Sequence, residues 1–493
     1  MSSGMVYFVG AGPGDVDLIT IKGKRALQQA DVVIFDRLIN PFLLTDIKDD
    51  AKLIYCGKQP CKHTLRQEDI QREILIHARK GKTVVRLKGG DPAVFGRVGE
   101  EAELLAEHQI DYEIIPGITA GIAATMYSGV PITHRKHSKS FAVVTGHGSR
   151  DDGTPNINWN HLAKGVETIV FYMGIKHLKT ITTELMKNGK AKETAVLVVQ
   201  WGTYSKQRTV DGSLATIANK VEQANITNPA IIIVGDVVKL REKLAWFDNR
   251  VLSGKSFLIP SKEDTNKELV TSLKKHGADV FEHNLLTERD PLPEEIFEQL
   301  KLVSSKRQQL ILLSPRSVFT FLKALGEQGL DLRKIHSSIL SKDEAVQSVL
   351  QMVGIQSRLV DDVLLHQPML VGGDLEIENV RVDGAQTAKE LILSFSKVAQ
   401  KDSEAFNRLL DEQHVNTLLF TTRKDVSQFL KFLELTNSSK EKVVEQVTIF
   451  CIGKEASLLL EENNIPVDRY IETANVTELI EDYQEVAVLA KES

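Results

Sequence analysis

Residues Val84 to Arg97 read VVRLKGGDPAVFGR. The β-branched start predicts a buried strand, and the two adjacent glycines after it lack Cβ atoms, so that a ligand or another backbone can approach the chain closely. Asp91 can accept hydrogen bonds from hydroxyl or amino groups of a ligand, although Asp91-Pro92 is also typical of a simple turn. The stretch therefore predicts a strand that ends at a binding turn, with a turn alone as the alternative.

Two further segments place small residues after a predicted strand. VGAGPGD (Val9–Asp15) precedes a helical pattern, an arrangement in which backbone amides at a helix start bind a ligand. It lacks the third glycine of the dinucleotide fingerprint, while Asp36 lies near the position of the ribose-binding acid of that fingerprint. PGITAGIAA (Pro116–Ala124) predicts a helix start at Thr119-Ala120. Each segment alone also fits a helix packed closely on a sheet without a ligand.

Short β-branched runs alternate with amphipathic helical patterns, such as Glu68–Lys80 and Glu100–His108, through the first half. This alternation predicts α/β domains, the first with a mostly parallel sheet, and the pattern restarts after Gly129-Val130-Pro131. Pro155–Asn160 and Gln223–Pro229 are predicted loops. The predicted strands are Val6–Gly10, Val32–Phe35, Thr83–Leu87, Glu113–Ile115, Phe141–Thr145, Thr168–Tyr172, Thr194–Val199 and Ala230–Val234.

The main domain boundary is predicted at Trp246–Gly254, a polar stretch that ends in glycine and precedes a new strand at Lys255–Pro260. The expected domains are 1–248, with subdomains of about 1–133 and 134–248, and 255–493. Within the second domain, LILLSPRSVFTFLKAL (Leu310–Leu325) and LLFTTRKDVSQFLKFL (Leu418–Leu433) share a strand, a polar turn and an amphipathic helix. This repeat predicts two similar lobes.

Composition excludes several classes of protein. With 61 basic and 66 acidic residues among 493, the net charge of −5 gives no field for non-specific nucleic-acid binding. Cys56, Cys61 and Cys451 fit neither a disulfide framework nor a zinc site and suit a reducing compartment. No signal sequence is evident, and no apolar run reaches the roughly 18 residues of a membrane span. We expect a cytoplasmic protein without metal, nucleic acid or membrane.

Together these segments resemble the tetrapyrrole methyltransferases that use S-adenosylmethionine, and among them the uroporphyrinogen-III C-methyltransferases, from about Val6 to Val238. The motifs that carry the resemblance, in the family's order, are VGAGPGD, VIFDRLI, Gly57-Lys58, RLKGGDPAVFGR, IIPGITAG, SGVPITHR, VTGH, FYMG, Gly202-Thr203 with Gln207-Arg208, and NPAIIIVGDVV. The resemblance implies a two-domain α/β fold that binds S-adenosylmethionine in the cleft between its domains. The donor contacts that it implies are Pro13, Gly89, Gly90, Asp91, Val94, Thr119, Ala120, Met173, Gly202 and Ala230.

The resemblance also implies the chemistry. Electron-rich pyrrole carbons of uroporphyrinogen III attack the sulfonium methyl group, so the site must orient the substrate, neutralise its eight carboxylates and handle a proton. By resemblance Asp36 is the proton acceptor and Lys58 the proton donor, in a homodimer formed by this half. Asp36 has a competing interpretation as a helix N-cap. The basic candidates for pairing with carboxylates, each of which also fits a solvated surface position, are Arg37, Arg66, Arg86, Lys88, Arg97, His134 and Arg135.

From about Lys255 to Tyr483 the chain resembles uroporphyrinogen-III synthase, a bilobed α/β protein with its active cleft between the lobes, although Leu364–Lys401 departs from the pattern. The implied protein is bifunctional: it converts hydroxymethylbilane to uroporphyrinogen III, then methylates C2 and C7 to give precorrin-2, toward siroheme or cobalamin. The alternatives are a methyltransferase for a later corrin intermediate with a non-catalytic second half, and a dinucleotide-binding oxidoreductase. The candidate residues of the synthase cleft are Ser314, Arg316, Thr421, Thr422 and Thr473.

Overall fold

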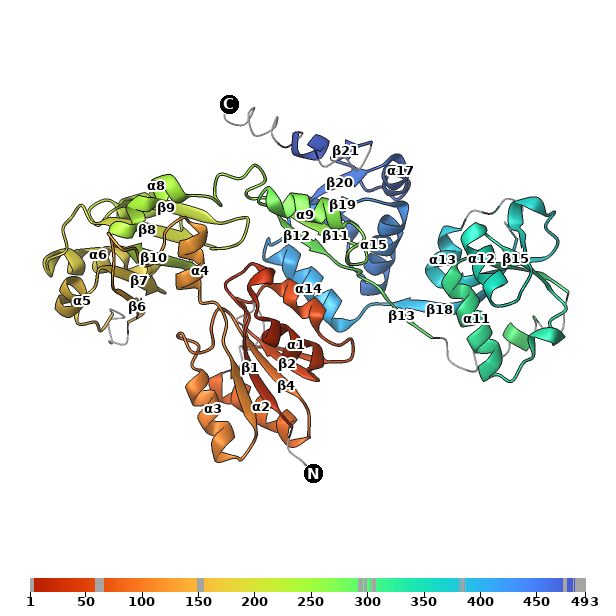
Figure 1. Cartoon of the computed structure of the whole chain (residues 1–493), viewed down its shortest axis with the longest axis horizontal. Helices are drawn as coiled ribbons and strands as arrows, with labels where there is room; N and C mark the ends of the chain where they lie inside the picture. The colour runs from red at the N-terminus through yellow and green to blue at the C-terminus, as the bar shows by residue number, and fades with distance from the viewer. Residues whose placement is uncertain are drawn as a thin grey trace.

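The computed structural model (Figure 1) folds the chain, over the residues that it describes, into four β-sheets covered by helices. Two sheets belong to the first half of the chain and two to the second. Within this described part, no helix is both long and apolar enough to cross a membrane. The described residues are 4–57, 66–148, 155–290, 296, 299–301, 303, 307–380, 382, 385, 387–472, 477–481 and 483.

The first sheet is entirely parallel, in the order β3, β2, β4, β1, β5. Its three central strands are largely buried because α1 (Ile21–Gln29) covers one face, while α2 (Gln67–Arg79) and α3 (Val98–Glu107) cover the other. The four strands predicted in this domain are confirmed to within one residue at each end, and the fifth, β3, was not predicted. The strands are β1 (Val6–Gly10), β2 (Val32–Phe35), β3 (Lys52–Tyr55), β4 (Val84–Lys88) and β5 (Tyr112–Ile115).

The second sheet is mixed, in the order β6, β7, β10, β8, β9, and only β6 and β7 pair in parallel. Helix α4 (Ala120–Tyr127) leads into this domain from the first. The loop predicted at Pro155–Asn160 is wrong at its end, because Trp159 begins α5. The other elements are α5 (Trp159–Gly165), α6 (Leu178–Lys187), α7 (Ile217–Gln223), β6 (Phe141–Thr145), β7 (Thr168–Tyr172), β8 (Ala195–Gln200), β9 (Arg208–Ser213) and β10 (Ala230–Val234).

The second half forms two lobes, as the repeat predicts. The docked lobe contains a parallel sheet in the order β12, β11, β19, β20, β21, and lies against the first half (Figure 1). Its strands are β11 (Ser256–Ile259), β12 (Asp279–Glu282), β19 (Thr417–Phe420), β20 (Thr448–Ile452) and β21 (Arg469–Ile471). Its helices are α9 (Lys267–Lys275), α14 (Gln400–Asp411), α15 (Arg423–Thr436), α16 (Lys440–Gln446) and α17 (Lys454–Glu462).

The distal lobe is inserted into the docked lobe between β12 and α14 and lies at the far end of the molecule (Figure 1). The connecting strands β13 and β18 pair antiparallel, and β18 runs on into α14. Leu364–Lys401, where the sequence departs from the synthase pattern, thus contains β17, α13 and β18 of the distal lobe and the start of α14, and it does not begin a lobe. The elements of the lobe are β13 (Thr287–Arg289), β14 (Gln309–Leu312), α11 (Pro315–Glu327), β15 (Ser338–Ser341), α12 (Glu344–Met352), β16 (Arg358–Leu359), β17 (Pro368–Gly373), α13 (Asp374–Asn379) and β18 (Lys389–Lys397).

The predicted linker Trp246–Gly254 is folded against the first half. Phe247 and Leu252 are buried, and the indole N–H of Trp246 donates to the Met126 carbonyl at 3.0 Å. This stretch has more polar residues than buried apolar residues. Its composition therefore indicates a linker, although Phe247 and Leu252 are packed.

The docked lobe packs directly against both domains of the first half. The rings of Phe42 and Phe281 lie 4.9 Å apart, and the Ser205 backbone N–H donates to the Asp279 carboxylate at 2.9 Å. Lys206 donates to two carbonyl groups at the C-terminal end of α14. Burial raises the pKa of Asp279 to about 7, against the effect of the hydrogen bonds from Ser205, and lowers the pKa of Lys206 to about 8.

Candidate functional site

The candidate residues of the first domain gather at the carboxyl ends of its parallel strands, where α/β proteins bind ligands. The loops after β1 and β4 are joined by two backbone hydrogen bonds, from Gly12 N–H to the Gly90 carbonyl (3.2 Å) and from Gly90 N–H to the Gly12 carbonyl (2.7 Å). The loop after β5 is also close, since a Cβ on Gly10 would lie 2.5 Å from the Gly117 Cα. Three glycine-containing motifs of the sequence therefore form one continuous surface.

Asp91 braces two of these loops with its carboxylate. Its Oδ2 accepts a hydrogen bond from the Gly117 N–H at 3.0 Å, and its Oδ1 accepts one from the Ala93 N–H at 2.7 Å. The turn interpretation of Asp91-Pro92 is therefore confirmed. Each carboxylate oxygen has a second lone pair, so the contact with a ligand hydroxyl stays a prediction.

The Cα of Gly90 faces the start of α4. Its φ is +69°, and the nearest neighbours of a Cβ built there would be the Thr119 Cα at 3.8 Å and the Ala120 N at 3.9 Å. These are ordinary van der Waals contact distances, so a single methyl group would fit at this position without a clash. No side-chain atom of the described residues lies within 4 Å of that position, so the backbones of Gly90, Thr119 and Ala120 face one another directly. This arrangement fits the expected methyl donor.

The second domain contributes the segment that follows β7. The Tyr172 hydroxyl shares a hydrogen bond with the Thr119 hydroxyl at 2.6 Å and accepts one from the Gly121 N–H, and burial raises the pKa of Tyr172. The next residue, Met173, has φ +55° and an exposed side chain. The structure therefore brings Met173 to the edge that carries Thr119.

The remaining donor candidates occupy three different loops and one strand. Pro13 lies in the loop after β1, and Gly89 lies against the loop after β2, where its Cβ would be 3.1 Å from the Leu38 Cβ. Val94 closes the turn after β4, and Ala230 begins β10. Gly202 meets α4 so closely that a Cβ would lie 2.2 Å from the Ala124 Cβ. A packing role is therefore sufficient for Gly202, and its contact with the donor stays a prediction.

Four charged side chains form a network beneath the strand ends. The Arg86 Nη2 donates to Asp36 Oδ1 at 2.7 Å, and its Nε lies 3.6 Å from Glu101 Oε1. Lys88 Nζ lies 2.8 Å from Glu101 Oε2. Arg86 and Lys88 alternate along β4 and so share one face of the sheet, where α3 supplies Glu101. The charges balance, and Asp36 is the member whose side chain reaches solvent, with 33% of its surface exposed.

The network fixes the environment of the Asp36 carboxylate. Burial works against the charge of Arg86, but the neighbouring charges, that of Asp36 foremost, leave the pKa of Arg86 raised. Burial also lowers the pKa of Lys88 and raises that of Cys56 to about 12; the Cys56 thiol lies 3.3 Å from Asp36 Oδ1. Asp36 is thus oriented by a permanently charged guanidinium beside a thiol that stays protonated.

The structure decides between the two interpretations of Asp36. Asn40 caps the short helix Pro41–Asp46, because its Oδ1 accepts a hydrogen bond from the Phe42 N–H at 3.0 Å. The N-cap interpretation of Asp36 is therefore wrong. Lys58, the predicted proton donor, lies outside the described residues.

The basic candidates of the first half fall into two groups. Arg86 and Lys88 are 3% and 4% exposed and pair with carboxylates inside the domain, a position that does not fit direct pairing with substrate carboxylates. The others lie at the surface. Arg37 is exposed next to Asp36, and Arg66 precedes α2.

Three more basic candidates lie on connecting segments. Arg97 is exposed and pairs with Glu100 at 2.6 Å. His134 and Arg135 lie in a turn closed by a hydrogen bond from the His134 N–H to the Ser138 carbonyl at 2.8 Å. Their contact with a substrate stays a prediction.

In the second half, the described polar candidates serve as helix caps or lie at the surface. Ser314 and Thr422 are the equivalent N-caps of α11 and α15, and the Thr421 hydroxyl donates to Asp425 at 2.8 Å. Arg316 is exposed and pairs with Glu288. Thr473 lies outside the described residues.

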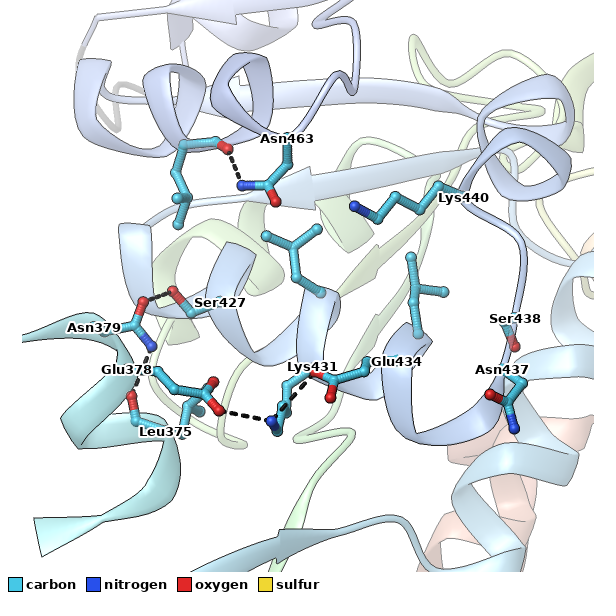
Figure 2. Close-up of a pocket in the computed structure, with 13 residues that line it drawn as sticks. Leu375, Glu378, Asn379, Ser427, Lys431, Glu434, Asn437, Ser438, Lys440 and Asn463 are labelled. Atoms are coloured by element: carbon cyan, nitrogen blue, oxygen red, sulfur yellow. Dashed lines mark hydrogen bonds and ion pairs between the residues drawn. The ribbon is translucent and has the colours of Figure 1, made fainter. Parts of the chain in front are cut away.

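The two lobes meet at a polar pocket of about 590 Å³ between α13 and α15 (Figure 2). Lys431 of α15 lies 2.7 Å from Glu378 of the distal lobe and 3.2 Å from Glu434. Ser427 donates to Asn379 across the same junction. The lysine is neutralised by these carboxylates, and none of the described cleft candidates lines the pocket. It therefore joins the lobes without offering an excess of positive charge to an anionic substrate.

Sequence reasoning missed two residues of the first-half site. Glu101 is 1% exposed yet lies in a helix that reads as amphipathic, and the charged pair on β4 was the only signal of a buried partner. Tyr172 lies within the FYMG motif, of which only Met173 was predicted as a donor contact. A tyrosine at the end of a buried strand is itself a signal, because its hydroxyl needs a polar partner.

Comparisons with known proteins agree on the family. Residues 5–218 match the family of Tetrapyrrole (Corrin/Porphyrin) Methylases. The chain is similar to Uroporphyrinogen-III C-methyltransferase of Bacillus subtilis (strain 168), 38% identical over 93% of each chain, and to that of Priestia megaterium, 55% identical over 48% of this chain and 98% of the relative. Among solved structures, uroporphyrin-III C-methyl transferase from Thermus thermophilus complexed with S-adenyl homocysteine is 38% identical, with a TM-score of 0.42 over 48% of this chain and 100% of that one.

Proposed function

This chain belongs to the uroporphyrinogen-III C-methyltransferases, a family of tetrapyrrole methylases, and we infer that it transfers methyl groups from S-adenosylmethionine to uroporphyrinogen III. The observation that carries the inference is the meeting of the loops after β1, β4 and β5 at the carboxyl-end edge of the sheet, where no described side chain separates Gly90 from the start of α4. VGAGPGD lacks the third glycine of the dinucleotide fingerprint, which argues against a dinucleotide-binding oxidoreductase. The full-length similarity to a uroporphyrinogen-III enzyme favours that substrate over a later corrin.

The donor would be held mainly by backbone. We propose that Gly90, Thr119 and Ala120 contact the donor from the first domain together with Pro13 and Gly89, and that Met173 approaches it from the second domain. Bound S-adenosylmethionine supplies an electrophilic methyl group. The protein's task is to hold the tetrapyrrole carbon in line with that group, since positioning alone lowers a bimolecular barrier substantially.

Asp36 is proposed to accept the proton that the methylated pyrrole ring must lose. The Asp36 carboxylate lies at the same carboxyl-end edge of the sheet. One side of it is exposed, and the buried guanidinium of Arg86 holds the other. A carboxylate with a fixed orientation can also stabilise the cationic ring before the proton leaves. Arg37, which is exposed and follows Asp36 in the sequence, is proposed as a partner for a substrate carboxylate.

We propose C2 and C7 as the two methylation positions, which makes precorrin-2 the product. The test is to supply purified protein with uroporphyrinogen III and S-adenosylmethionine and to identify the products by mass spectrometry and NMR. Two added methyl groups at C2 and C7 are expected. A product methylated elsewhere, or no methylation while S-adenosylhomocysteine binds, contradicts the proposal.

We propose that the second half is a uroporphyrinogen-III synthase. The support is its architecture: two α/β lobes with equivalent strand–helix units, β14–α11 and β19–α15, each capped by a hydroxyl residue. Hydroxymethylbilane without S-adenosylmethionine should then yield the isomer with ring D inverted. Formation of only the unrearranged isomer, by protein that still methylates added uroporphyrinogen III, would leave the second half without this activity.

A homodimer through the first half completes the proposal. Ile122 and Met126 lie one turn apart on α4 with 43% and 53% of their surface exposed, which suits burial against a second copy. Light scattering should give twice the chain mass. A monomer at micromolar concentration contradicts it.

A further inference from the structure

A side chain of the second half reaches the proposed methyl transfer site. Arg408 of α14 is 5% exposed, and its Nη2 donates to the backbone carbonyl of Arg37 at 3.0 Å. Arg37 directly follows Asp36, so this hydrogen bond is made to the turn that carries the proposed proton acceptor. It joins residues that are 371 positions apart in the sequence.

The guanidinium of Arg408 is itself firmly held. Its carbon lies 5.3 Å from the centre of the Phe35 ring and 5.1 Å from that of Tyr55, at the ends of β2 and β3. Its Nε donates to Glu412 Oε1 at 2.8 Å, one helical turn further along. A planar cation that stacks on rings and is fixed by a carboxylate loses little freedom when it binds a carbonyl.

We propose that Arg408 is a positioning residue for methyl transfer: the second half of the chain holds the Asp36–Arg37 turn in place from outside the site. The proposal rests on the proposed function of the first half. Relatives such as that of Priestia megaterium match this half over 98% of their length, so they have no room for a counterpart of α14. In this chain the turn has gained a support that those relatives lack.

A second contact of the same helix provides a matched control. Lys401, at the start of α14, donates to the Thr45 carbonyl at 3.0 Å and pairs with Asp49 at 3.0 Å. The short helix Pro41–Asp46 follows the Asp36–Arg37 turn. Thr45 lies at the end of this helix, and Asp49 lies beyond it. Lys401 therefore supports the docking of the two halves without contacting the turn.

The experiment compares full-length wild type with Arg408→Met, Arg408→Lys and Lys401→Met. Each protein is tested for its melting temperature, for S-adenosylhomocysteine affinity by calorimetry, and for kcat and KM of uroporphyrinogen methylation. Losing one hydrogen bond to a carbonyl should lower kcat of Arg408→Met by roughly three- to ten-fold, with donor affinity unchanged. Arg408→Lys, which retains a donor and a charge, should recover at least half of kcat.

Lys401→Met should lower the melting temperature as Arg408→Met does but leave kcat within twofold. The proposal is overturned if Arg408→Met keeps kcat, or if Lys401→Met loses as much. Should Arg408→Met fail to fold, Glu412→Gln, which loosens the guanidinium and also weakens the pairing with His414, must still lower kcat. Absence of methylation by the wild type would instead refute the proposed function and leave this contact a docking contact.

Discussion

Gly90→Ala separates a donor-binding turn from a structural one. The added methyl group would lie 3.8 Å from the Thr119 Cα and 3.9 Å from the Ala120 N, so it clashes with no protein atom. The left-handed φ of +69° should cost about 1–2 kcal/mol of stability. If the space belongs to the donor, overpacking it should weaken S-adenosylhomocysteine binding at least about tenfold, equivalent to roughly 1.4 kcal/mol.

Gly329→Ala is the matched control for this measurement. Gly329 has φ +63°, lies in the distal lobe, and would place its Cβ with nothing within 4 Å. Urea titration should show a similar loss of stability for both variants, while calorimetry should show weaker binding only for Gly90→Ala. Affinity within twofold of wild type in Gly90→Ala would show that the donor does not occupy this space.

Three other variants test separate parts of the argument. Asp36→Asn should lower single-turnover methylation by about 100-fold or more, and a rate within threefold of wild type at saturating substrates removes Asp36 from the catalytic group. The pKa of Asp279, about 7 in the folded protein, exceeds its ordinary value of about 3.9, so the folded chain retains a proton that the unfolded chain releases, and stability falls as pH rises between about 4 and 7. Asp279→Asn should therefore remove a loss of about 1–3 kcal/mol between pH 5 and pH 8 in urea titrations; the same pH dependence in both proteins would contradict this. Gly14→Ala would place a Cβ 2.3 Å from the Tyr204 ring and should lower the free energy of unfolding by roughly 1–3 kcal/mol. An unchanged urea midpoint would mean that the two domains of the first half separate at this contact without cost.

Strand positions in the first half were predictable because the apolar runs are short and rich in β-branched residues. Val6–Gly10, Val32–Phe35 and Ala230–Val234 agree with β1, β2 and β10 at both ends. The direction of pairing was not predictable for β10. A strand buried on both faces reads as a continuous apolar run whether its neighbours are parallel or antiparallel.

The charged network beneath the site shows the limit of pattern reading. Arg86 and Lys88 alternate with apolar residues along β4, which is the pattern of a strand with one face in solvent. That face is buried because α3 brings Glu101 against it, and a partner so far along the chain leaves no local signal. Arg86, which the family resemblance made a candidate for pairing with substrate carboxylates, holds Asp36 in the structure.

The insertion of the distal lobe sets an order of events during synthesis of the chain. Phe257 of β11 pairs with Thr417 of β19, and the ribosome must first make the whole distal lobe between them. At typical elongation speeds β11 and β12 wait roughly ten to thirty seconds for that neighbour. The first half is complete by then and already offers the Phe42 ring to Phe281. The first half can therefore cover part of the unfinished sheet until β19 has been synthesised.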